Sequence, residues 1–301
     1  MLEWRKRLQG LGLLLRPIPV LSWSGGACLL GIGLALRTTS VVPIARLLRL
    51  LAIALVVQGW LAHSLNDRVD WQSGTDQTAA EILSGGSGAL KRGYLRHEQL
   101  LPIAALSLLL VLALVYRQTA NWLMYLYLAV GLWGAITYSH PSWRLAYKPL
   151  TGEWVAAFPA IVACTLAFYQ GFAGRLDFFS IAAAMLHGLL SISWLMQHHL
   201  PDWYRDLHSS PPKRTTIAHV AAKSNLQMAR LVVVGYFLLT ALVASIFSLV
   251  NQRFAWTAWL ALLCAALAYR QDTALRQEMA RRELQMVGLT LLHAFVLGWM
   301  L

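Results

Sequence analysis

The sequence predicts an all-α membrane protein, a bundle of about nine transmembrane helices with a polar cavity at its cytoplasmic side. Three observations carry the prediction. The chain of 301 residues is 58% hydrophobic and only 13% charged, whereas a soluble domain has about 25% charged residues. Its mean hydropathy is +0.55. Apolar runs of about 20 residues, long enough to cross about 30 Å of hydrocarbon, recur along the whole chain.

The expected elements follow these runs in chain order, within a single domain that covers residues 1–301. Residues 1–16 combine Trp4 and several leucines with a basic cluster, a pattern typical of a short amphipathic segment that lies in the membrane interface. After it we expect nine spans, at 17–36, 44–65, 98–116, 120–138, 153–172, 177–198, 226–250, 254–270 and 285–301.

The distribution of basic residues predicts the orientation. The formal net charge is +12, which in a soluble protein would suggest a nucleic acid partner. The spans explain it better, because basic residues of membrane proteins gather on the cytoplasmic face and against anionic headgroups. With the amino terminus inside, most of the 25 basic residues fall on inner segments. We therefore expect a multi-pass protein of a bacterial inner membrane, with the bilayer and no nucleic acid as partner, and with cytoplasmic motif-bearing loops at 66–97 and 199–225.

The first candidate site is an acidic motif at the end of the second span. Its polar members are Asn66, Asp67, Asp70 and Asp76. If the helix continues through Asp67 and Asp70, their carboxylates share one face, since residues three apart are neighbours. Carboxylates this close repel one another unless a cation lies between them, and Mg²⁺ prefers such oxygen ligands. A solvated helix end is the plainer alternative for any single aspartate.

A second acidic motif follows the sixth span. Asp202 and Asp206 are four residues apart, one helical turn, and Lys213 and Arg214 come shortly after them. This pattern has two interpretations. One is a surface network of ion pairs, which would contribute little to stability. The other is a site in which carboxylates hold a metal ion while the cations bind phosphate oxygens.

Two further polar segments supply cations for the same chemistry. The segment 138–153 contains two tyrosines, Arg144 and Lys148, and the glycine-rich segment 85–93 contains Lys91 and Arg92. Carboxylates can hold Mg²⁺, and Mg²⁺ together with lysine and arginine can hold diphosphate oxygens. The combined pattern therefore predicts a diphosphate pocket at the cytoplasmic face.

Together these motifs resemble the UbiA-type intramembrane prenyltransferase superfamily. Segments 66–76 and 202–215 are similar to the two aspartate-rich motifs of that family. Segment 85–93 resembles its glycine-and-base segment, and 138–153 resembles its tyrosine-and-lysine loop that ends in Gly-Glu. The form of the first motif and of the tyrosine loop is nearest to the dihydroxynaphthoate polyprenyltransferase branch.

The sequence also departs from the family pattern. His198 stands where the family often has asparagine, four residues before the second motif. Pro211 and Pro212 belong to a slightly longer connection to Lys213, and Ala146 stands at a frequent lysine position of the tyrosine loop. These differences concern the second metal site and the branch, and they leave the core acids in place.

The resemblance implies Mg²⁺-dependent transfer of a polyprenyl group from polyprenyl diphosphate to an aromatic acceptor, through an allylic carbocation, in menaquinone biosynthesis. Two Mg²⁺ ions are expected. The implied residues fall into three sets: metal ligands Asn66, Asp67, Asp70, His198, Asp202 and Asp206; diphosphate-binding residues Lys91, Arg92, Arg144, Lys148, Lys213 and Arg214; and catalytic residues Asp76, Tyr138, Tyr147 and Glu153.

Three alternatives remain open at this stage. The acceptor could be a hydroxybenzoate, a porphyrin or a lipid headgroup, with a similar pocket and a different acceptor wall. The protein could instead transport an anionic solute, but transporters usually show internal repeats and polar residues near the bilayer midplane. It could also be a catalytically impaired scaffold, because the second motif is altered.

Overall fold

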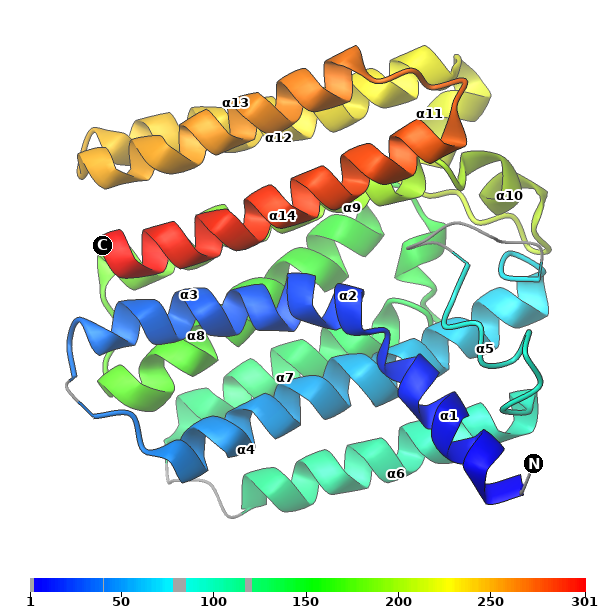
Figure 1. Cartoon of the computed structure of the whole chain (residues 1–301), viewed down its shortest axis with the longest axis horizontal. Coiled ribbons are helices and arrows are strands. Elements are labelled where there is room, and N and C mark those ends of the chain that lie inside the picture. Colours follow the sequence, from blue (N-terminus) through cyan, green and yellow to red (C-terminus); the bar gives the residue numbers. More distant parts are fainter. Residues whose placement is uncertain (1–2, 40, 78–84, 117–120) are drawn as a thin grey trace.

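The computed structural model describes residues 3–39, 41–77, 85–116 and 121–301, and every regular element in them is helical. The long helices run alongside one another, and α5, α10 and α11 gather at one end of the bundle (Figure 1). In chain order the elements are α1 (Glu3–Leu15), α2 (Pro17–Val20), η1 (Leu21–Gly25), α3 (Gly26–Leu36), α4 (Ile44–Leu55), η2 (Val56–Ala62), α5 (His63–Ser73), α6 (His97–Tyr116), α7 (Trp122–Thr137), η3 (Leu145–Tyr147), η4 (Gly152–Ala157), α8 (Phe158–Ala173), α9 (Phe178–His199), α10 (Trp203–His208), α11 (Thr216–Lys223), α12 (Leu226–Ser248), η5 (Gln252–Phe254), α13 (Ala255–Arg270) and α14 (Arg276–Met300).

The chain is built as a multi-pass integral membrane protein. Within the described residues, seven helical segments are long and apolar enough to cross a membrane. Two other expected spans, 120–138 and 254–270, fall on α7 and α13, which have 16 residues each and are about 24 Å long at 1.5 Å per residue. Residue 120 lies outside the described residues. The seven segments are Glu3–Leu36, Ile44–Ser73, His97–Tyr116, Gly152–Ala173, Phe178–His199, Leu226–Ser248 and Arg276–Met300.

Helix α9 is the central helix of the bundle. It is buried over most of its length and contacts α3, α8, α12 and α14. Its sequence accounts for this position, because apolar and small residues surround the helix instead of forming one stripe. Small residues on the neighbouring helices allow close packing: a Cβ atom at Gly31 of α3 would lie 2.5 Å from the carbonyl oxygen of Thr165 in α8.

Two helix boundaries differ from the expectation near the candidate site. Helix α5 continues to Ser73, so Asn66, Asp67 and Asp70 lie on a helix where the loop 66–97 was expected, and Asp76 follows in a turn. The helix ends at Gly74, whose φ of 88° is left-handed and suits glycine. Helix α14 begins at Arg276, well before the expected span 285–301. The charged residues of 276–284 indicated a polar connection. Glu283 is instead buried, with its Oε1 2.8 Å from the His198 Nδ1 of α9, so this segment packs against the bundle as part of the helix.

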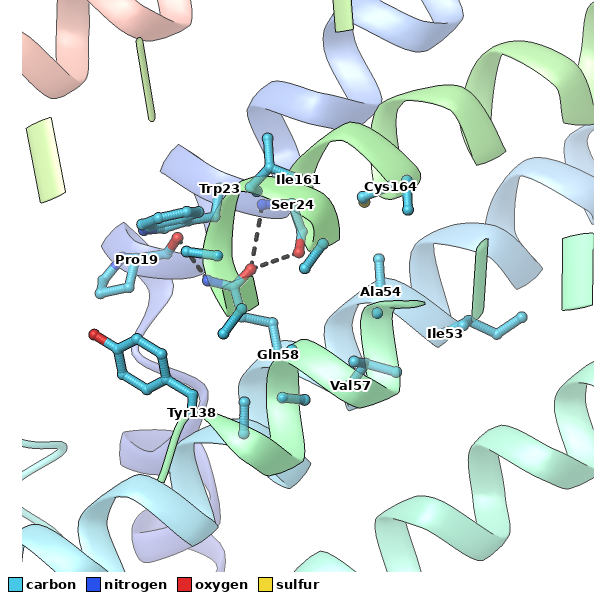
Figure 2. A pocket seen from close by; sticks show the side chains of 18 of the residues that line it. Pro19, Trp23, Ser24, Ile53, Ala54, Val57, Gln58, Tyr138, Ile161 and Cys164 are labelled. Carbon is cyan, nitrogen blue, oxygen red and sulfur yellow. Dashed lines mark hydrogen bonds between the residues drawn. The ribbon is translucent and has the colours of Figure 1, made fainter. Parts of the chain in front are cut away.

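Three π-helical segments, η1, η2 and η4, interrupt the longer helices. The Gln58 side chain of η2 joins two of them: its Oε1 accepts from the Ser24 backbone N–H at 3.2 Å, and its Nε2 donates to the Pro19 carbonyl at 3.0 Å (Figure 2). π-Helical turns are rare and occur often at functional sites. All three segments contribute residues to one cavity.

The amino-terminal helix α1 lies at the same end of the bundle as α5 (Figure 1). It exposes Trp4 and Leu8 together with Arg5 and Arg7, as expected of an interfacial helix. On its other side, the His63 Nδ1 of α5 lies 2.8 Å from the carbonyl oxygen of Leu14. This contact fixes the end of α1 beside the first acidic motif.

Candidate functional site

The first acidic motif is centred on Asp70, which is buried near the carboxyl end of α5. Its Oδ2 accepts from Asn66 Nδ2 at 2.8 Å and from Lys213 Nζ at 2.7 Å. Its Oδ1 accepts from the Tyr147 hydroxyl at 2.8 Å. Three donors from three separate segments therefore converge on one carboxylate.

The neighbouring Asp67 is held by the glycine-rich segment. Its carboxylate accepts from the backbone N–H of Ser87 at 3.0 Å and from the Ser87 hydroxyl. The backbone can approach this closely because residue 86 is glycine: its φ is 71°, and a Cβ atom there would collide with the Oδ2 of Asp76.

Asp76 completes the first cluster. It is buried, and its Oδ2 has no hydrogen-bond partner among the described residues. Burial raises the pKa of Asp76 well above its usual value, and the nearby Asp70 and Asp67 carboxylates raise it further. An orphaned carboxylate oxygen of this kind has the capacity to bind a ligand or a proton.

The second acidic motif lies on and before α10. Asp202 pairs with the guanidinium of Arg205. Asp206 is only 1% exposed, and its Oδ2 has no partner in the described part of the chain. Burial raises the pKa of Asp206 to about 8, with Lys213 opposing the shift and Asp202 adding to it.

Lys213 brings the two motifs together. Its backbone N–H donates to the carbonyl of Asp206 at 2.7 Å, while its ammonium reaches Asp70 in the other motif. Burial disfavours the charged form, but the Asp70 and Asp206 carboxylates more than offset it, so the pKa of Lys213 lies well above its usual value. A backbone hydrogen bond from Ser210 to Ser73, at 2.9 Å, closes the same contact between the loops.

The carboxylates fit Mg²⁺ in kind, since all are oxygen donors and two of them have orphaned oxygens. They are not gathered around one point: no group of three or more His, Cys, Asp or Glu side chains in the described residues is arranged to hold a metal ion. The reason is visible in their partners, because Asp70 is turned to Lys213 and Asp202 to Arg205.

The tyrosine loop faces the same centre. Burial raises the pKa of the Tyr138 phenol to about 12, and the charges of Lys213 and Asp70 both reach it. Glu153, expected near the reaction centre, is 4% exposed and accepts from the hydroxyls of Thr216 and Tyr236. Its carboxylate ties the loop to α11 and α12.

The predicted cations divide into two groups. Besides Lys213, Arg144 stacks over the Tyr147 ring at 5.6 Å, and Lys91, although exposed, lines a small hollow with Asp67 and Asp76. Arg92, Lys148 and Arg214 are exposed. His198, expected as a metal ligand, has its Nδ1 2.8 Å from Glu283 Oε1.

A cavity of about 290 Å³ lies in the bundle and reaches Asn66 of the first motif and Tyr138. Figure 2 shows Pro19, Trp23 and Tyr138 at one end, with Ile53 and Cys164 at the other. The first end is polar and aromatic, and the second is lined by apolar side chains of α4, α7 and α8. The polar and aromatic side chains of the lining include Arg16, Trp23, His63, Asn66, Tyr138, Trp194, His198 and Glu283, and its apolar side chains include Leu50, Ile53, Ala54, Val57, Met124, Leu128, Ala160, Ile161 and Phe168.

Sequence reasoning missed three polar residues of this cavity. Arg16 has a left-handed backbone, with φ 46°, and its charge reaches Asp76. Gln58 is a lone polar residue two turns before Asn66, a spacing that puts both on one helix face. Glu283 is an acid just before an apolar run. Each gave a local signal, but only the fold shows that they share one cavity.

No protein-family model and no curated protein matches the sequence. Solved structures do match. A UbiA homologue from Archaeoglobus fulgidus bound to GPP and Mg²⁺ aligns with a TM-score of 0.71 at 14% identity, covering 96% of this chain and 99% of that one. The same homologue bound to DMAPP and Mg²⁺ gives 0.68 at 13% identity, with 96% and 99% covered. A digeranylgeranylglyceryl phosphate synthase gives 0.63 at 15% identity, with 98% and 99% covered. The chain therefore has the UbiA-type fold over nearly its whole length.

Proposed function

We propose that this protein is a Mg²⁺-dependent prenyltransferase that moves a polyprenyl group from polyprenyl diphosphate to an aromatic acceptor. One observation carries the proposal: a largely apolar cavity inside a membrane bundle reaches Asn66 and Tyr138, close to the centre where Lys213 joins the two buried acidic motifs. A prenyl diphosphate has these two halves, an apolar tail and a multiply charged head that cannot enter hydrocarbon. The solved neighbours bound to GPP or DMAPP with Mg²⁺ support it.

Two Mg²⁺ ions would be held by Asn66, Asp67 and Asp70 on one side and by Asp202 and Asp206 on the other. When bound, the metal would neutralise diphosphate charge and so favour departure of the leaving group. His198 was assigned to this set by resemblance; its Nδ1 contact with Glu283 leaves only Nε2 for any ligand.

The chain's own cations would bind the diphosphate. Lys213 and Arg144 border Tyr147, and Lys91 lies beside the first cluster. Positive charge at this point stabilises the negative charge that develops on the departing oxygen. The exposed Arg92, Lys148 and Arg214 stay in the proposal as residues that reach the diphosphate from the loops.

Carbon–oxygen cleavage leaves an allylic cation, which must be kept from water and near electron-rich groups. Tyr138 lines the cavity at its polar end and would provide a π face. Tyr147 donates to Asp70, so it would also orient that carboxylate. Asp76 is the better placed of the two predicted bases, because its Oδ2 is unpartnered among the described residues, whereas Glu153 already accepts from two hydroxyls.

The proposal also covers the identity of the acceptor. The motifs favour a dihydroxynaphthoate and thus a role in menaquinone biosynthesis, with the site on the cytoplasmic side of a bacterial inner membrane. The digeranylgeranylglyceryl phosphate synthase among the structural neighbours makes a glycerol phosphate acceptor the second candidate.

The test is product formation by the purified protein from radiolabelled polyprenyl diphosphate. Reactions with 1,4-dihydroxy-2-naphthoate, 4-hydroxybenzoate or geranylgeranylglyceryl phosphate would be run with Mg²⁺ or with a chelator. We expect a Mg²⁺-dependent naphthoate product, and its loss in Asp67→Ala and Asp202→Ala proteins that still insert into membranes. Transport without covalent product would favour a transporter, and absence of turnover with every acceptor would favour an impaired scaffold.

A further inference from the structure

We infer that the acceptor ring binds at the end of the cavity that is lined by Trp23, Trp194 and the His198–Glu283 pair. The inference rests on the proposed function and names the acceptor class that this end would take. That class is a planar aromatic ring carrying hydroxyl groups.

The aromatic wall comes from two elements that are far apart in the sequence. Trp23 lies on η1 and Trp194 on α9, and their ring centroids are 5.0 Å apart at an interplanar angle of 61°. Both rings line the cavity, as does Tyr138, which lies at the same end as Trp23 (Figure 2). Flat rings pack on such walls in offset or edge-to-face contacts, whereas a flexible headgroup gains little there.

The polar pair lies on the same side of α9. His198 follows Trp194 by four residues, so the two side chains share a helix face. Its Nδ1 is 2.8 Å from Oε1 of Glu283, which is 1% exposed, and both residues line the cavity. A carboxylate has more acceptor sites than this one contact uses. Glu283 therefore offers acceptor capacity to a hydroxyl group of the ligand.

The unused donor is the indole N–H of Trp194. Trp194 is 3% exposed, and its Nε1 is buried with no hydrogen-bond partner in the described residues. Buried donors are nearly always paired, because an unpaired one carries the cost of its lost hydration. A ligand oxygen would satisfy it.

The groups at this end select among the acceptor candidates. A phenolic hydroxyl donates to Glu283 in a charge-assisted hydrogen bond. A glycerol phosphate acceptor offers neither a ring to pack on Trp23 and Trp194 nor a phenolic hydroxyl for this carboxylate. The structure thus assigns hydroxyaromatic acceptors to this subsite in preference to phosphate-bearing lipids.

Steady-state kinetics of single variants test the subsite. Trp194→Phe keeps an aromatic ring and removes only the N–H, so we expect the KM for 1,4-dihydroxy-2-naphthoate to rise about tenfold, as for the loss of one buried hydrogen bond. Glu283→Gln should raise the same KM. The KM for the prenyl diphosphate should stay unchanged in both. Trp143→Phe is the matched control, because Trp143 is 44% exposed and is absent from the cavity lining.

A binding measurement separates this inference from the proposed function. Geranyl thiodiphosphate with Mg²⁺ should raise the thermal midpoint of wild-type and Trp194→Phe protein equally, and added dihydroxynaphthoate at one fixed concentration should raise it further by more in the wild type than in the variant. No response to the thiodiphosphate in either protein would refute the proposed function itself. An equal naphthoate response in both proteins, or an unchanged acceptor KM in Trp194→Phe, would overturn the subsite alone.

Discussion

Replacing Lys213 with methionine removes the cation that lies between the two acidic motifs while keeping a side chain of similar length. The ammonium is 2.7 Å from Asp70, and both side chains are less than one-tenth exposed. Breaking a buried ion pair by removing one partner costs about 3–5 kcal/mol, because the other charge stays buried. Asp70 keeps its hydrogen bonds from Asn66 and Tyr147, so we expect the lower end of that range, about 3 kcal/mol.

The assay is thermal unfolding of the detergent-solubilised protein without divalent ions and with Mg²⁺. A loss of about 3 kcal/mol lowers the midpoint by about 5 °C in a chain of this size. Mg²⁺ should raise the lowered midpoint of Lys213→Met part of the way back, because the metal can replace the lost positive charge. Lys148→Met is the control, since Lys148 is exposed. A Lys213→Met midpoint equal to that of the control, with or without Mg²⁺, would refute the idea that Lys213 balances the acidic centre.

Three further expectations can be checked independently. Gly86→Ala should reduce turnover at least tenfold, because the new Cβ atom would collide with Asp76. Gly88→Ala is the control, since Gly88 has a similar φ of 73° but its Cβ atom would meet no side chain closer than 3.9 Å. This control should lose only about 1 kcal/mol of stability. In the absence of metal, the free energy of unfolding should fall as the pH rises from about 4 to about 8, because the pKa of Asp206 is raised from 3.8 to about 8 on folding. The free energy of unfolding of Asp206→Asn should depend less on pH across this range. Gln58→Leu should lower the unfolding free energy by about 1–3 kcal/mol, since it removes the amide that joins two π-helical segments; an unchanged denaturation midpoint would contradict that role.

The helices of the bundle were predictable because a membrane span needs only length and hydrophobicity. Each expected range falls mainly on helical structure. The placement of α14 was less accurate: Glu283 and the arginines before it indicated a polar connection. The local sequence could not show that Glu283 pairs with His198 on another helix.

The acidic motifs were predictable in part. The three-residue spacing of Asp67 and Asp70 indicated a shared helix face, and the repeat of the same chemistry after span six indicated a common site. The partners of these acids were not predictable, because they come from distant segments: Ser87 binds Asp67, and Lys213 binds Asp70. A basic residue near an acidic motif suggested a phosphate ligand, whereas in this structure the lysine neutralises the motif itself.

The sequence predicted that the bundle would contain a polar cavity, but it could not show which residues form the walls of the observed one. Its walls include residues of η1, η2, η4, α4, α7, α8 and α9, and periodicity gives no sign of where π-helical turns will open a bundle. Arg16 illustrates the limit, since its left-handed backbone, with φ 46°, turns the chain between α1 and α2. Only the assembled fold brings that residue to the lining.

An experimental structure with Mg²⁺ and geranyl thiodiphosphate would test the central claim most directly. The account predicts diphosphate and metal density between the pair Asp67 and Asp70 and the pair Asp202 and Asp206, with the geranyl chain in the cavity beyond Tyr138. Diphosphate bound at another surface, or a geranyl chain outside the cavity, would contradict it.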